Sequence, residues 1–297
     1  MPSMKAIKQR RASVTNMQQA MRAMNLVATA KLQRARQEWQ NIKGFVEGTD
    51  GLMLSAALDA QAAEHFYVQG RGASRNAVYL VISSDRGKCG GYNLNVAKAA
   101  ANHARDYGKN AKFIVVGLKG LEFFLSRGQV AQYEAAPKST PAYSQAQYLS
   151  TMLIDLFRDK TSALNGEENP MGEVDEVYIV YTKFTSILAT EPRVVQVLPL
   201  NARLAGQTNN KRNPMEFDPG PEAFLTYMVS NYLTAYVYGA MMESVVCEQA
   251  ARMLNMDAAT NNAQEIIEDL TLMYNRQRQG AITQEITEIV SGANALQ

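Results

Sequence analysis

The fold is decided by Met242–Tyr274, which reads MESVVCEQAARMLNMDAATNNAQEIIEDLTLMY. Its seam positions alternate steps of four and three residues without a break, which is the pattern of a coiled-coil helix. The pattern lies in a longer segment, from Pro221 to about Ala293, that holds no proline after its first residue. Such a helix is about 110 Å long, whereas a compact domain of this chain length is about 40 Å across. We therefore expect the C-terminal helix to project from the globular part.

The N-terminal residues 3–57 carry a matching pattern with one phase slip near Ala28. The expected seam positions are Val14, Met17, Met21, Met24, Ala28, Leu32, Ala35, Trp39, Ile42 and Val46. A long amphipathic helix needs a partner in water, so we expect the two terminal helices to pair as an antiparallel coiled coil. Charge favours this pairing, because residues 1–57 hold nine basic and three acidic residues and residues 265–297 hold two basic and five acidic.

Between the two helices, the pattern changes to short apolar strands that alternate with helices. Strands are expected at Ala77–Ser83, Ala111–Val116, Val130–Glu134, Val174–Tyr181 and Val194–Leu198, and helices at Asn93–Tyr107, Lys119–Ser126 and Ala142–Leu164. The sequence thus predicts an α/β fold: a long antiparallel coiled coil of the N- and C-terminal helices plus a central Rossmann-like β/α domain. The expected domains are 1–57 (N-terminal helix), 75–200 (β/α domain), 201–220 (loop) and 221–297 (C-terminal helix, paired with 1–57).

Composition argues against several functions. The two cysteines, Cys89 and Cys247, and two histidines, His65 and His103, are too few for a disulfide framework or a Cys/His metal site. No Ser/His/Asp set or H-E-x-x-H motif is present, so we expect no catalytic residue, no metal and no cofactor. The net charge of +2 does not favour a nucleic-acid partner. No run reaches 18 apolar residues and no secretory signal begins the chain, so we expect neither a membrane span nor secretion.

The loop Asp85–Asn93 (DRGKCGGYN) follows the first expected strand, where Gly-rich turns often bind phosphate. Its glycines fit neither G-x-G-x-x-G nor G-x-x-x-x-G-K-[ST]. The favoured interpretation is a tight strand-to-helix turn, with Cys89 as a buried structural thiol. Two alternatives stay open: a nucleotide-binding enzyme that uses this loop, and a coiled-coil structural adaptor with an embedded β/α domain.

Four segments resemble the gamma subunit of rotary F-type ATP synthases of the bacterial type. They are YNRQRQGAITQEITEIVSGA at Tyr274–Ala293, EQAARMLNMDAATNN at Glu248–Asn262, MRAMNLVATAKL at Met21–Leu32 and SDRGKCGGYN at Ser84–Asn93. The resemblance covers the chain from end to end. Three positions depart from the family pattern, with Lys88 where leucine is usual and Asn255 and Gly280 where alanine is usual. The role of Lys88 stays open.

The resemblance implies a central rotor stalk that couples ion flow, expected to be protons, to ATP synthesis or hydrolysis. In that family the stalk turns inside a head of three alpha and three beta subunits, and the catalytic sites are on beta. The implied partners are alpha, beta, the epsilon subunit and the c ring, with delta and the membrane a and b subunits in the same complex. Membrane association is indirect, through the c ring, at the cytoplasmic face of the bacterial inner membrane. Proton or sodium coupling, and net synthesis or hydrolysis, stay open.

The resemblance also assigns contacts to individual residues. The implied contacts with beta are Arg278, Gln279, Thr283, Gln284, Met24 and Lys31. Met24 and Lys31 lie where the shaft passes an acidic segment of beta, and Arg252 braces that region. Glu216 and Phe217 are expected at the foot, where epsilon and the c ring meet the shaft.

Overall fold

The computed structural model describes residues 3–59, 64–72, 75–129, 131–137, 140–158, 174–201, 216–218 and 220–295. The chain divides into two compact units, one of Met1–Thr29 with Arg252–Gln297 and the other of Ala30–Ala251. The two long helices, α1 (Met4–Ala57) and α7 (Pro221–Ala295), contribute to both units. Most of the predicted loop 201–220 lies outside the described residues, and the predicted division into four domains stays a prediction.

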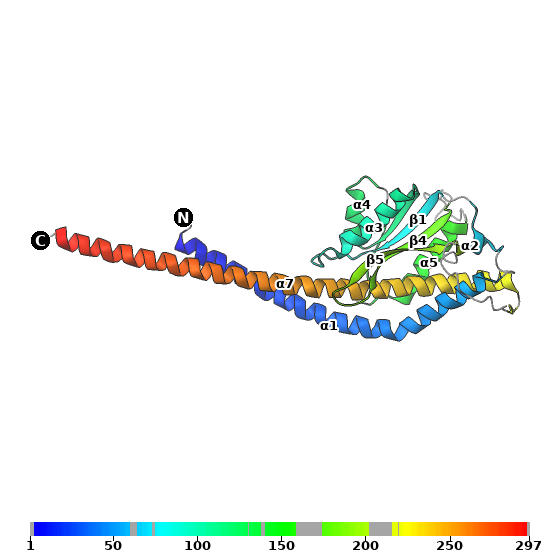
Figure 1. The fold of residues 1–297 in the computed structure, drawn as a ribbon, viewed down its shortest axis with the longest axis horizontal. Coiled ribbons are helices and arrows are strands. Elements are labelled where there is room, and N and C mark those ends of the chain that lie inside the picture. The colour runs from blue at the N-terminus through cyan, green and yellow to red at the C-terminus, as the bar shows by residue number, and fades with distance from the viewer. Residues whose placement is uncertain are drawn as a thin grey trace. The chain divides into compact units, whose positions relative to one another are not determined.

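The second unit contains a five-stranded sheet (Figure 1). Its strands are β1 (Asn76–Ile82), β2 (Asn110–Val116), β3 (Ala131–Glu134), β4 (Glu176–Phe184) and β5 (Thr190–Leu198). Their order is β3-β2-β1-β4-β5; the first four run parallel, and β5 runs antiparallel to β4. The predicted α/β fold with a central β/α domain is confirmed, with the addition that the sheet is mixed.

Helices cover both faces of the sheet (Figure 1). On one face lie α3 (Tyr92–Asp106) and α4 (Leu118–Leu125), and on the other lie α5 (Tyr143–Arg158) and part of α7. Successive side chains of a strand point to opposite faces, so β1 contributes to both cores. Tyr79 packs with α3 and α4, whereas Leu80 packs with α5 and α7. Burial on both sides explains why β1 is a continuous apolar run.

The predicted boundaries differ from the observed ones mostly by one residue and most at the last two strands, and one helix was missed. The strand expected at Val174–Tyr181 is observed at Glu176–Phe184. The strand expected at Val194–Leu198 begins four residues earlier, at Thr190. Pro192 suggests a loop, yet it pairs with Thr182, because proline is tolerated in an edge strand. The helix expected at Ala142–Leu164 is described as far as Arg158, and the residues that follow lie outside the described chain. The short helix α2 (Phe66–Gln69) was not expected.

In the first unit, the start of α1 pairs with the later part of α7. The apolar side chains of this seam are Ile7, Val14, Met21, Ala263, Ile267, Leu270 and Tyr274. Asn25 Nδ2 donates to the Met253 carbonyl at 3.0 Å, and Gln18 Nε2 donates to Gln264 Oε1 at 2.9 Å. Residue numbers fall along α1 as they rise along α7, so the pairing is antiparallel, as predicted.

The predicted seam of α1 is wrong at two positions. Met17 is 56% exposed and Met24 is 38% exposed, while the next residues, Gln18 and Asn25, bond to α7. A shift of one residue turns a helical side chain by about 100°, so the methionines point away from the seam. Periodicity selects methionine because it is apolar. The amides can occupy the seam instead because α7 offers each of them a hydrogen-bond partner.

Candidate functional site

The last turns of α7 are exposed. Between Arg278 and Ser291 only Ala281 is half-buried, and every other residue is exposed. In the first unit this end of α7 extends past the start of α1 (Figure 1). The reason is the pairing itself, because α1 begins at Met4 and the Arg11 guanidinium already lies 5.7 Å from the Tyr274 ring centroid. This exposed end, residues 278–291, holds four of the predicted contact residues.

An apolar strip runs along the exposed end. Ile282 is 46% exposed, Ile286 56%, Ile289 72% and Val290 52%. Residues three and four apart share one helical face, so these side chains form a continuous surface. Large exposed apolar surfaces of this kind mark contact sites.

The polar side chains of the exposed end bond mostly within the helix. Thr283 Oγ1 donates to the Gln279 carbonyl at 2.9 Å, one turn earlier, as threonine hydroxyls in helices often do. Gln284 Nε2 donates to Glu288 Oε1 at 2.9 Å. Arg278 and the Gln279 side chain are exposed at the start of this end. A partner would therefore meet an apolar strip preceded by one cation and one amide.

The other predicted shaft contacts lie outside the exposed end. Met24 and Arg252 belong to the first unit, where Met24 is partly exposed and Arg252 is half-buried. Lys31 is half-buried and belongs to the second unit. Within the first unit, the hydrogen bond of Asn25 to the Met253 carbonyl puts Met24 and Arg252 several turns of α7 before the exposed end.

The two predicted foot residues differ in their surroundings. Glu216 is exposed. Phe217 is half-buried, and its ring centroid lies 5.3 Å from that of Phe224 in an edge-to-face arrangement. Both rings pack against the core that covers the α5 and α7 face of the sheet. Phe217 therefore has a packing role in addition to any partner contact.

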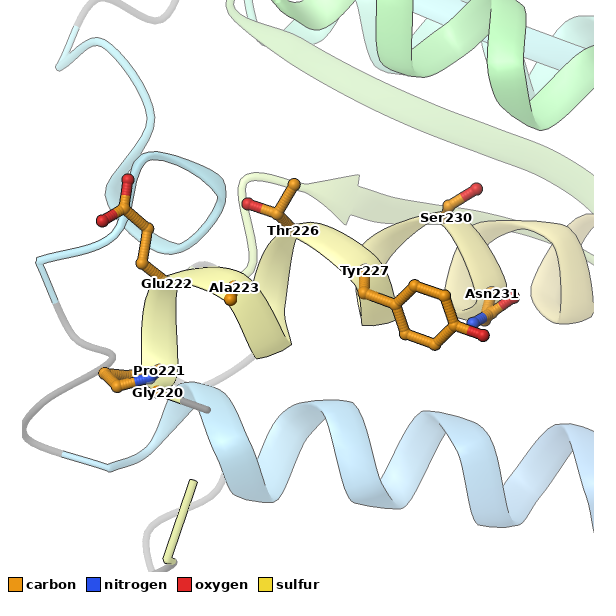
Figure 2. A pocket seen from close by; sticks show the side chains of 8 residues that line it. All are labelled: Gly220, Pro221, Glu222, Ala223, Thr226, Tyr227, Ser230 and Asn231. Carbon is orange, nitrogen blue, oxygen red and sulfur yellow. The ribbon is translucent and has the colours of Figure 1, made fainter. Parts of the chain in front are cut away.

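A groove of about 1090 Å³ lies nearby, at the start of α7 (Figure 2). It is lined by Gly220, Pro221, Glu222, Ala223, Thr226, Tyr227, Ser230 and Asn231. Figure 2 shows Glu222 and Thr226 pointing to one side of the helix and Tyr227 to the other. Catalytic and ligand sites need polar groups that converge, so this groove is better described as open surface.

The Gly-rich loop is closed by its own side chains. Asn93 Oδ1 accepts the Ser84 N–H at 2.9 Å, and Asn93 Nδ2 donates to Cys89 Sγ at 3.2 Å. Asp85 Oδ1 accepts the N–H of Leu118, the first residue of α4, at 2.9 Å. Because these groups bond within the domain, the geometry favours the tight turn over phosphate binding.

The unusual backbone of this loop fits the same interpretation. Lys88 has φ of 64° and Gly90 has φ of 57°, so both lie in the left-handed region. Lysine rarely adopts this conformation, which makes Lys88 the strained residue of the turn. Cys89 is 1% exposed, which confirms the predicted buried thiol.

A buried ion pair joins the starts of two strands. Lys109 Nζ lies 2.7 Å from Glu176 Oε2, and the two side chains are 8% and 10% exposed. Tyr178 Oη donates to the same carboxylate oxygen at 3.0 Å. Burial, followed by the charge of Glu176, raises the pKa of Tyr178 far above its ordinary value. These contacts hold the starts of β2 and β4 together, so the buried charges of Lys109 and Glu176 have a structural explanation.

Sequence reasoning missed a polar contact between α7 and β4. Glu243 Oε1 accepts the Phe184 N–H at 2.9 Å, and the Cys247 thiol donates to the Thr182 carbonyl at 3.3 Å. Burial raises the pKa of the Glu243 carboxyl and, with the nearby charge of Glu243, that of the Cys247 thiol. From sequence alone, a glutamate in a heptad helix is expected to face solvent, so Glu243 was not predicted to be buried. The available signal was Cys247, one turn later on the same face.

Over the part of the chain that the structure describes, no three His, Cys, Asp or Glu side chains lie close enough together to hold a metal ion. None of the described helices has both the length and the apolarity needed to cross a bilayer.

Comparisons with known proteins agree with one another. A family model described as ATP synthase matches residues 3–296. A protein of Alkaliphilus metalliredigens named ATP synthase gamma chain is 37% identical over 298 residues, covering 99% of this chain and 98% of the relative. A protein of Acetobacterium woodii named ATP synthase gamma chain, sodium ion specific, is 35% identical over 98% of this chain and 97% of the relative. In fold, the chain is similar to a central-stalk chain of the Tetrahymena thermophila mitochondrial ATP synthase, with a TM-score of 0.57 and 20% identity over 81% of this chain and 99% of that one.

Proposed function

This chain belongs to the ATP synthase gamma-chain family and is a central-stalk subunit of a rotary ATP synthase, and from this membership we propose how it couples ion flow to ATP chemistry. It turns inside a head of three alpha and three beta subunits, while its foot is driven by a c ring. The observation that carries the proposal is the exposed end of α7, which continues beyond α1 with an apolar strip. A surface of this kind needs a surrounding partner.

The apolar strip acts as a bearing. Fully burying an Ile or Val side chain stabilises by about 1.5–3 kcal/mol. The four side chains of the strip are each roughly half exposed, so a surrounding collar would gain roughly 3–7 kcal/mol in total. Apolar contact is not directional, so this term retains the helix end without fixing its angle.

Directional contacts supply the coupling. Arg278 and Gln279, with Thr283 and Gln284 on the next turn, bond to a loop of one beta subunit at a time. Three beta subunits of identical chemistry then meet different sides of the shaft, which biases each toward a different conformation. Reversing an equilibrium from 1:99 to 99:1 takes about 5.5 kcal/mol. Hydrogen bonds to charged groups contribute about 1.5–3 kcal/mol each, so a few such contacts reach that scale.

The remaining predicted residues serve the lower shaft and the foot. Met24 and Lys31 pass an acidic segment of beta, which the basic N-terminal helix attracts. Arg252 braces the shaft beside Met24, since their chain neighbours Met253 and Asn25 are joined by a hydrogen bond. Glu216 and Phe217 meet epsilon and the c ring, with delta and the membrane a and b subunits in the same complex. The chain has no catalytic residue of its own, and the catalytic sites are on beta.

The complex lies at the cytoplasmic face of the bacterial inner membrane, and this chain reaches the membrane only through the c ring. Protons are the proposed coupled ion. Because one relative is named sodium ion specific, pumping is to be measured with both ions.

A tagged copy of the chain tests this proposal. It is recovered from gently solubilised membranes, the co-purified proteins are identified by mass spectrometry, and the ATPase activity of the eluate is measured. The proposal expects alpha, beta, epsilon and c subunits together with ATPase activity. Recovery of the chain with unrelated proteins and no ATPase activity would instead favour the adaptor alternative.

A further inference from the structure

Strand β4 is longer than its pairing with β1. The strand spans Glu176–Phe184, but β1 pairs only with Glu176–Val180. On the other side, β5 stays paired as far as Phe184. Residues two apart in a strand direct their N–H and C=O groups to the same side, so Thr182 and Phe184 face one side together.

Two side chains of α7 take the place of the missing strand. Glu243 accepts the Phe184 N–H, and Cys247 donates to the Thr182 carbonyl. The spacings match, because four helical residues rise about 6.0 Å and two strand residues about 6.6 Å. We call these four residues, Glu243, Cys247, Thr182 and Phe184, the α7–β4 clasp.

We propose that the α7–β4 clasp carries torque between the β/α domain and the shaft helix, an inference that rests on the proposed rotor function. Both partners lie in the second unit, and Glu243, Cys247 and Thr182 are 6%, 0% and 4% exposed. Apart from a contact between the Tyr236 and Tyr181 side chains, the rest of the packing of α7 on this face of the sheet is apolar. Apolar packing is not directional, so it resists rotation of the helix about its axis less than bonds to a strand backbone do.

The chemistry of Glu243 favours such a positioning role. Within the described residues, none of the ion pairs includes Glu243, and Lys183, Lys43 and Arg193 act on it only from a distance. A buried carboxylate loses its hydration, and an apolar residue at this position would avoid that cost. The clasp gives a reason for the carboxylate: it supplies the acceptor that the Phe184 N–H needs.

The test compares variants of the chain in the whole reconstituted complex. Glu243→Leu keeps the size of the side chain and removes the acceptor, whereas Glu243→Gln keeps an acceptor oxygen. Losing one partner of a buried hydrogen bond raises the open population of the contact by about fivefold to a hundredfold. We therefore expect E243L to lower the number of ions pumped per ATP hydrolysed while hydrolysis continues, and E243Q to stay near the unmodified level.

Assembled E243L complexes that pump as many ions per ATP as the unmodified complex would overturn the torque role, because a residue that only stabilises the fold changes yield and leaves this ratio intact. The Cys247→Ala and Cys247→Ser pair repeats the comparison at the other half of the clasp. Failure of the proposed function is distinguishable, since in that case the unmodified chain itself would not support pumping.

Hydrogen exchange in the unmodified complex keeps the inference testable even where E243L does not assemble. The clasp predicts that the Phe184 amide is protected to the same degree as the Val180 amide inside the sheet. Exchange as fast as at Leu188, in the exposed hairpin beyond β4, would mean that no stable clasp exists.

Discussion

Gly239 marks a close approach of α7 to α1 within the second unit. A Cβ atom at Gly239 would lie 2.8 Å from Val46 Cγ1 and 3.1 Å from Val46 Cγ2. Val46 is buried and β-branched, so its methyl groups cannot swing aside. We predict that Gly239→Ala forces the helices apart and destabilises the chain, although alanine is the better helix former.

The size of this effect follows from two opposing terms. Alanine gains about 1 kcal/mol of helix stability over glycine, whereas overpacking a core costs about 1–3 kcal/mol. The net result for Gly239→Ala is thus a loss of up to about 2 kcal/mol. Gly44 on α1 is the matched control, because a Cβ there meets nothing within 4 Å. Gly44→Ala is expected to stabilise by about 1 kcal/mol.

Urea unfolding of the purified chain and its variants measures both effects. Adding Val46→Ala to Gly239→Ala removes the clashing methyls, so the double variant should recover part of the loss, with a coupling of about 0.5–3 kcal/mol. The reasoning is refuted if Gly239→Ala stabilises the chain as much as Gly44→Ala does.

Three further predictions concern coupling, charge burial and pH. Replacing Arg278 and Gln279 together by alanine should reduce ATP-driven pumping severalfold in reconstituted vesicles, because their bonds to beta are lost; unchanged ATPase and pumping rates would contradict the assigned contact. Lys109→Met leaves Glu176 buried without its cation and should cost about 3–5 kcal/mol in thermal unfolding, so a loss well below 1 kcal/mol would show that the pair is dispensable. Burial raises the pKa of Glu243 above its ordinary 4.5, so the folded state resists ionisation of this carboxyl. The unmodified chain should therefore lose stability relative to E243Q as the pH rises from 4.5 through the raised pKa. Identical profiles of stability against pH for the two chains would exclude this penalty.

Most of the fold could be predicted because its signals are local. Heptad spacing identifies α1 and α7, and apolar runs bounded by polar turns identify β1 and β2. The predicted β5 was too short because Pro192 lowers strand propensity in any sequence-based prediction. That β5 is an edge strand, where proline is tolerated, is known only from the assembled sheet.

One part of the candidate site could likewise be predicted from the sequence, and another part could not. The exposed apolar end of α7 follows from the heptad series that continues through Ile282, Ile286 and Ile289 beyond any α1 partner. The α7–β4 clasp could not be predicted, because it depends on β4 extending beyond its pairing with β1. That difference in length is known only from the assembled sheet. The seam positions of Gln18 and Asn25 were missed because a search for apolar periodicity ignores polar side chains. These two amides lie in the seam because each forms a hydrogen bond with α7.

Rotation of the chain in the assembled complex tests the central claim most directly. Cys89 and Cys247 are 1% and 0% exposed, so a cysteine introduced at the exposed Lys98 on α3 offers a selective attachment point for an optical probe. With the alpha and beta head immobilised, the account predicts that the probe turns steadily in one direction when ATP is added and stops when ATP is removed. A probe that only fluctuates about a fixed angle, in complexes that still hydrolyse ATP, would contradict the rotor function.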